Sequence, residues 1–117
     1  MRIVDRILSV LLVLGATGHT FGVMQYYRNQ PDALFWSLCA GFLIVLVAAI
    51  NLVRTVRSGD RVIAWTAAGA SLGYLVVTLG FGRLIGNMAD PRVIGFALIS
   101  LGLVYFSVTD ALKAPPA

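Results

Sequence analysis

Four long apolar stretches, separated by short polar segments, dominate the hydrophobic pattern of the chain. Each stretch has about 17 to 21 residues, which is enough for a helix to cross about 30 Å of hydrocarbon at 1.5 Å per residue. Lipid-spanning backbone must be helical or form a closed barrel, and the alternation of a barrel strand is missing from this sequence. The pattern therefore predicts four transmembrane helices, at about residues 3–27, 33–54, 61–84 and 92–112.

The polar segments between these stretches contain residues that start helices. Pro31 and Pro91 stand just before the second and fourth stretches, where the missing N–H of proline does no harm. Asp32 and Asp90 lie near the same starts, where a carboxylate interacts favourably with the helix dipole. Short connections make neighbouring helices antiparallel. We expect an all-α integral membrane protein with an up-down bundle as a single domain over residues 1–113, then a short disordered tail at 114–117.

Composition excludes most other classes of protein. Hydrophobic residues make up 59% of the 117 and charged residues 12%, whereas soluble domains carry about 25% charge. The net charge of +4 comes from dispersed Arg and Lys without a nucleic-acid-binding pattern, so no nucleic-acid partner is expected. The apolar run Ile7–Met24 continues without a small-residue cleavage site, so it is expected to be a retained helix and not a signal peptide.

The distribution of Arg and Lys predicts the orientation. Tyr26, Tyr27 and Trp36 would mark the outer interface and Trp65 the inner one. An excess of basic residues marks the cytoplasmic side, so we expect a multi-pass protein of the plasma membrane, most simply the bacterial cytoplasmic membrane, with both termini in the cytoplasm. The six basic residues on that side are Arg2, Arg6, Arg54, Arg57, Arg61 and Lys113, and the three on the other are Arg28, Arg83 and Arg92.

A shift of the chain by 58 positions reveals a weak internal similarity. Chance in glycine-rich apolar sequence and a duplicated helical hairpin both explain it. A duplication would produce parallel repeats, a plan that also occurs in transporters. The coincidences pair Gly15 with Gly73, Thr20 with Thr78, Gly22 with Gly80, Asn29 with Asn87 and Asp32 with Asp90.

His19 is the ionisable side chain that the pattern places well inside a crossing, which makes it a functional candidate. Cys39 of the second stretch and Thr78 of the third reach a similar depth. The hypothesis is a small polar pocket of His19, Thr20 or Thr17, Cys39 and Thr78 near the outer surface. The alternative is a neutral histidine that hydrogen-bonds a neighbouring helix.

Known cofactor and catalytic patterns are not met by these residues. One histidine supplies a single haem ligand, and one histidine with one cysteine is too few for a metal. A Cys/His nucleophile needs a third, orienting group. No carboxylate of a proton-coupled exporter is expected at mid-membrane, and no nucleotide-binding or hydrolase motif is found. We therefore predict no cofactor, no metal site and no catalytic residue.

Two further groups of residues are expected to hold the helices together. At the inner edge, Asn51, Arg54 and Asp110 reach a similar depth, and an exposed Arg54–Asp110 pair would contribute about 1 kcal/mol or less. Glycines spaced along single helix faces allow close helix approach or ordinary packing. They are Gly15, Gly18 and Gly22 in the first helix, Gly69 and Gly73 in the third, and Gly95 and Gly102 in the fourth.

These observations favour a small membrane protein that is not an enzyme, with an accessory or structural and interaction role. Membrane lipids are expected partners, together with a second copy or a larger membrane complex. The alternatives are a small oligomeric transporter or channel, and a redox or ligand-binding protein centred on His19. In size, four predicted crossings and a glycine-rich first helix, the chain resembles the small bacterial membrane proteins grouped as DoxX-like, and no functional residue is carried over from them.

Overall fold

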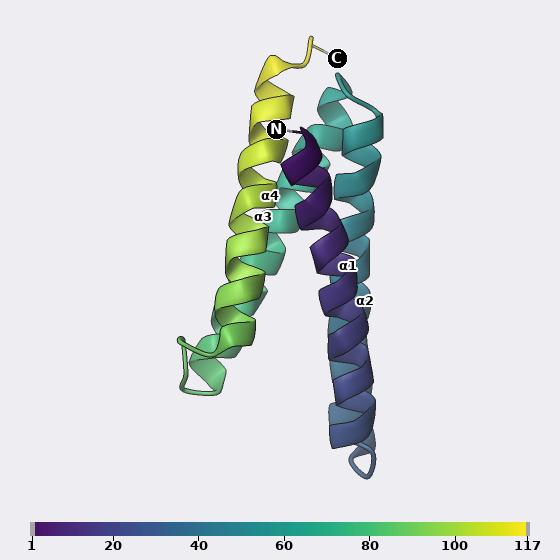
Figure 1. Cartoon of the computed structure of the whole chain (residues 1–117), viewed down its shortest axis with the longest axis vertical. Coiled ribbons are helices and arrows are strands. Elements are labelled where there is room, and N and C mark those ends of the chain that lie inside the picture. The colour runs from purple at the N-terminus through teal and green to yellow at the C-terminus, as the bar shows by residue number, and fades with distance from the viewer. Residues whose placement is uncertain (1, 117) are drawn as a thin grey trace.

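The computed structural model describes residues 2–116 and consists of four long helices joined by short turns (Figure 1). All four are long and apolar enough to cross a membrane, so this is a multi-pass membrane protein by helix length and hydropathy. Residues 114–116 follow the last helix without helical structure, whereas Met1 and Ala117 lie outside the described residues. The helices are α1 (Arg2–Tyr26), α2 (Pro31–Val56), α3 (Arg61–Leu84) and α4 (Pro91–Lys113).

The helix starts follow from local sequence chemistry. Asp60 and Asp90 are N-cap residues whose carboxylates accept hydrogen bonds from the backbone N–H groups of Ile63, at 3.1 Å, and Arg92, at 2.9 Å. Pro31 and Pro91 occupy the first turns of α2 and α4. The observed helix ends lie within two residues of the expected ones. The largest difference is in α2, because Pro31 and Asp32 belong to its first turn.

The four helices form two antiparallel hairpins, α1–α2 and α3–α4. Each hairpin has extensive internal contacts, and α2 also contacts α3 while α1 contacts α4. The hairpins lie together at the end that carries both termini and the α2–α3 connection, here called the N/C end (Figure 1). They diverge toward the other end, here called the turn end, where the α1–α2 and α3–α4 turns lie (Figure 1). The molecule is an elongated body of 50 × 23 × 23 Å.

The interior of the bundle contains polar as well as apolar side chains. An apolar core of Leu12, Ile44, Val47 and Leu103 lies between the helices. Large apolar side chains cover the outside, as lipid requires. Small and polar residues are buried, which lets helix backbones approach and satisfies hydrogen bonds inside the bundle. The fully buried polar side chains include Ser9, Asn51, Ser71, Ser100 and Ser107.

The glycines of the predicted packing faces differ in their surroundings. A Cβ atom on Gly15 would lie 2.6 Å from the Phe96 ring, and one on Gly102 would lie 2.5 Å from Leu8, so these two glycines permit contacts between α1 and α4. At the other five, an added Cβ would have no neighbour within 4 Å, so packing within the described chain does not require a glycine there. These five are Gly18, Gly22, Gly69, Gly73 and Gly95.

Candidate functional site

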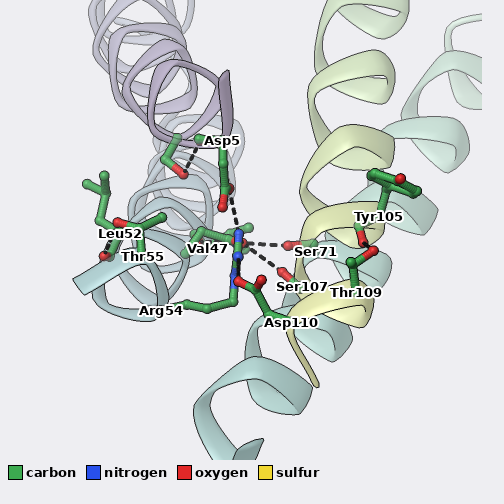
Figure 2. Close-up of polar contacts among 12 residues, drawn as sticks. Asp5, Val47, Leu52, Arg54, Thr55, Ser71, Tyr105, Ser107, Thr109 and Asp110 are labelled. Carbon is green, nitrogen blue, oxygen red and sulfur yellow. Dashed lines mark hydrogen bonds and ion pairs between the residues drawn. The ribbon is translucent and has the colours of Figure 1, made fainter. Parts of the chain in front are cut away.

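A buried ionic cluster joins helices near the N/C end (Figure 2). Arg54 of α2 is 1% exposed and donates through Nη2 to the carboxylate of Asp5 in α1, at 2.5 Å. Its Nη1 donates to the carboxylate of Asp110 in α4. The same guanidinium also donates to the side-chain oxygen of Asn51, at 3.2 Å. One cation therefore connects α1, α2 and α4.

Asn51 extends this cluster to the remaining helix. Its Nδ2 donates to the hydroxyl of Ser71 in α3 and to the carbonyl of Val47, both at 2.9 Å. Its Oδ1 accepts from the hydroxyl of Ser107 in α4, at 3.0 Å. All four helices thus meet in one network, whose members are Asp5, Asn51, Arg54, Ser71, Ser107 and Asp110, here called the Arg54 cluster.

The structure brings Asn51, Arg54 and Asp110 together at the end of the bundle where the sequence places them. The expectation of an exposed Arg54–Asp110 pair is wrong for Arg54, because Asp5 covers the guanidinium from α1, although the Asp110 side chain is 43% exposed. Sequence reasoning missed Asp5, because the first apolar run was started at Ile7. A usable signal was present: Asp5 stands four residues before Ser9 and continues the buried stripe of α1.

A cavity lies between the two hairpins on the side of the turn end. Its volume is about 660 Å³, which falls in the range of sites for small organic ligands, about 300 to 1,000 Å³. All four helices contribute to its walls. Most of the wall is apolar, and Ile44 and Phe96 are among the lining residues. The Arg54 cluster thus joins the hairpins at one end, and this partly open cavity lies between them toward the other.

Several polar side chains interrupt the apolar wall of the cavity, among them His19, Tyr74 and Thr78. His19 of α1 forms a 3.0 Å hydrogen bond through Nε2 to the backbone carbonyl of Ser37 in α2. A carbonyl oxygen only accepts, so Nε2 carries the proton. Thr78 of α3 is 5% exposed, and its hydroxyl oxygen is itself buried beside Tyr74. Tyr74, one turn earlier on α3, packs edge-on against the ring of Phe96.

The rim of the cavity carries one guanidinium, whose charge is already paired. Arg92 donates to Asp90 from Nη2, at 2.8 Å, and from Nε, at 3.0 Å. These hydrogen bonds, with a third from the Arg92 backbone N–H, lower the pKa of Asp90 to about 2. The guanidinium also lies 5.6 Å from the centre of the Phe81 ring. The rim is therefore polar without a free positive charge.

The structure places His19 and Thr78 of the predicted pocket on the wall of this one cavity, whereas Thr20 and Cys39 do not line it. Thr20 faces Gly41, where an added Cβ would lie 2.7 Å from the Thr20 hydroxyl oxygen. Cys39 is exposed on α2. It follows Ser37 by two positions and so points about 200° around the helix from it. The four residues were grouped by their predicted depth in the membrane. The rotation of each helix about its axis turns Thr20 and Cys39 away from the cavity.

A metal ion is held by several ligand side chains that lie close together. Among residues 2–116, no three His, Cys, Asp or Glu side chains are grouped closely enough to hold a metal ion. Comparison with protein-family models, curated proteins and solved structures finds no match to the chain. The functional interpretation therefore depends on the Arg54 cluster and on the cavity.

Proposed function

We propose that this protein binds a small amphipathic molecule from the membrane in the cavity between its hairpins, without catalysing a reaction. The observation that carries the proposal is the lining of the cavity: mostly apolar walls interrupted by polar side chains, among them His19, Ser37 and Tyr74, inside a membrane-spanning bundle. Ligand sites in proteins have this mixture of apolar area and few polar groups. No carboxylate that could orient His19 stands among the lining residues, which favours binding over catalysis.

The Arg54 cluster supports this role by fixing one end of the bundle. Its hydrogen bonds run from α2 to α3 and α4, and so join the two hairpins at the N/C end. Toward the turn end, no side-chain hydrogen bond of the described residues joins one hairpin to the other; that of His19 stays within the α1–α2 hairpin. The cavity lies between the hairpins at this end. A ligand can therefore enter between the hairpins without breaking the buried ion pairs.

Gly22 offers a direct test, because it lines the cavity and an added Cβ there meets no atom within 4 Å. We expect Gly22→Leu to fold, because leucine is a better helix former than glycine, and to occupy part of the cavity. The measurement is native mass spectrometry of the protein released from lipid nanodiscs, counting molecules that remain bound. The variant should retain several-fold fewer of them than the wild type.

Gly18→Leu is the matched control. Gly18 stands one turn earlier on α1, is equally open, and does not line the cavity. It should retain the same molecules as the wild type. Equal retention by the wild type and both variants would contradict the proposal.

An interaction role is the second candidate. The observation that favours it is that Gly69 and Gly73 are exposed one turn apart on α3, with open space above both. Such a face allows another helix to approach closely, either from a second copy or from a larger membrane complex. Cross-linking in native membranes should capture that partner, and a strictly monomeric protein would contradict this role. We further propose the bacterial cytoplasmic membrane as its location, with the N/C end in the cytoplasm.

A further inference from the structure

We propose that an anionic phospholipid binds on the exposed side of α1 at the N/C end, with its phosphate at Arg6 and an acyl chain in an apolar groove beside that residue. This site is at the opposite end of α1 from the cavity and does not depend on the ligand proposed there. Three features of the surface carry the proposal: the groove, the unpaired arginines next to it, and the depth of both in the membrane.

The groove has a volume of about 280 Å³ and is formed by α1 alone. Its lining residues are Ile3, Arg6, Ile7, Val10 and Leu11, all of them exposed. Their spacing of three and four residues places them on one side of the helix. The surface of the groove is entirely apolar, so Arg6 contributes the methylene groups of its side chain and keeps its guanidinium outside. A hydrocarbon chain fits a groove of this kind.

Arg2 and Arg6 carry charges that no described carboxylate neutralises. Both side chains are exposed, and none of the ion pairs among residues 2–116 includes either of them. Asp5, which stands between them in the sequence, is buried in the bundle and is paired with Arg54. Arg2 precedes Arg6 by one turn, so the two side chains are neighbours on the helix surface. Their positive charge is therefore available to an anion.

The length of α1 places these arginines at the level of the lipid headgroups. Its 25 residues span about 37 Å at 1.5 Å per residue, against about 30 Å of hydrocarbon. Helix side chains lean toward the N-terminus, so Arg2 and Arg6 extend toward the headgroups. Val10 and Leu11 lie deeper, at the level of the acyl chains. The charged and apolar parts of the site thus follow the order of the parts of one phospholipid.

The charge of the whole N/C end favours an anionic headgroup over a zwitterionic one. Six basic residues and three aspartates lie at this end, compared with three basic residues and two aspartates at the turn end. A zwitterionic headgroup carries its own cation, which cancels part of the attraction to this excess. Each Arg or Lys near the membrane surface strengthens the binding of anionic lipid about 5-fold.

Nanodiscs with equal amounts of dioleoyl phosphatidylglycerol and dioleoyl phosphatidylcholine test the proposal, because the two lipids differ only in the headgroup. The measurement is native mass spectrometry of the released protein, counting each lipid that remains bound. We expect the wild type to retain phosphatidylglycerol in several-fold excess and Arg6→Gln to lower this excess about 5-fold. Arg6→Lys, which keeps the charge, should keep most of the excess.

Lys113→Gln is the matched control for the charge. It removes one positive charge from the same end of the bundle, and Lys113 is exposed and does not line the groove. The excess of phosphatidylglycerol should stay close to that of the wild type. Because Arg6 and Lys113 are both exposed, neither variant is expected to unfold the bundle.

Val10→Phe tests the groove separately from the charge. Val10 is 47% exposed, so a larger side chain can be accommodated at the lipid-facing surface while it fills the groove. Leu14→Phe is its control, because Leu14 lies one turn deeper, is 61% exposed and does not line the groove. We expect Val10→Phe to retain several-fold less phosphatidylglycerol and Leu14→Phe to retain as much as the wild type. Glycerol 3-phosphate, which has no acyl chain, should not displace the lipid.

The outcomes decide between this site and its alternatives. Equal retention of the two lipids by the wild type, or equal losses in Arg6→Gln and Lys113→Gln, would overturn the proposal, because the lipid would not be held at Arg6. Displacement by glycerol 3-phosphate, or unchanged retention in Val10→Phe, would also overturn it, because the acyl chain would take no part. Gly22→Leu should leave the phosphatidylglycerol excess unchanged, since Gly22 lines the cavity and not this groove.

Discussion

Arg54 shows how one side chain can organise an apolar bundle. A guanidinium in a span that is otherwise apolar needs a counter-charge, because an unpaired charge away from water is costly. Asp5, whose side chain is 5% exposed, supplies that charge inside the bundle, and Asp110, whose side chain is 43% exposed, supplies another at its edge. Replacing such a pair with apolar residues can be tolerated, whereas removing one partner leaves a buried charge. The Arg54 cluster therefore determines which helix ends meet.

We predict that Arg54→Met destabilises the protein by about 3 kcal/mol or more, because it leaves the buried Asp5 carboxylate without its partner. The measurement is equilibrium unfolding in bicelles with a denaturing detergent. Arg57→Met is the matched control, because Arg57 is 66% exposed and lies 3.5 Å from Asp60, so its loss should cost less than about 1 kcal/mol. Asp5→Asn added to Arg54→Met should restore part of the loss. Equal effects of the two arginine variants would show that the ion pairs of Arg54 do not stabilise the bundle.

Within α3, glycines two residues apart have different roles. Gly82 is buried, and an added Cβ would lie 2.8 Å from the sulfur of Met88 and 2.9 Å from a methyl group of Val93. At Gly80, an added Cβ would meet nothing within 4 Å. Neither glycine was among those expected to pack. The rotation of α3 relative to α4 decides the difference.

We predict that Gly82→Ala destabilises the protein by about 1 to 3 kcal/mol, because the added Cβ would overlap the side chains of Met88 and Val93. Gly80→Ala should leave stability unchanged or raise it by up to about 1 kcal/mol through helix propensity. Thermal unfolding in the same detergent compares the two directly. A Gly80→Ala variant as unstable as Gly82→Ala would mean that lost glycine flexibility, and not contact with α4, is responsible.

For the molecule as a whole, both termini lie at the same end, as an even number of crossings requires (Figure 1). The basic residues are concentrated there too. Arg54 is paired inside the bundle and does not reach the surface, so the surface count is five at the N/C end against three at the turn end. The excess of basic residues at the N/C end is therefore smaller on the surface than in the sequence. It still favours the same end, so the proposed orientation is unchanged.

We predict that a cysteine at position 29 is labelled by a membrane-impermeant maleimide on intact cells, whereas one at position 58 is labelled only after permeabilisation. The variants are Asn29→Cys and Ser58→Cys, both exposed turn positions at opposite ends. Each is made with Cys39→Ser, which removes the single native cysteine. The opposite labelling pattern would place the N/C end outside the cytoplasm.

The helices and their ends were determined by the sequence alone. Apolar length, Pro31, Pro91 and the capping residues Asp60 and Asp90 act within contiguous segments, so their effect can be deduced without knowing the rest of the fold. The same information gives the depth of each side chain along its helix. It therefore indicates that Asn51, Arg54 and Asp110 share one level and that His19 and Thr78 share another.

The rotation of each helix and the divergence of the hairpins were decided by the tertiary structure. A helix that is apolar on every side does not specify which face turns inward. Contacts with the other helices choose that face, and so bring Asp5 onto Arg54 while leaving Cys39 outside the cavity. Where the hairpins pack closely, the charge of Arg54 is paired with carboxylates from two other helices. Where they diverge, a cavity lined by all four helices remains between them.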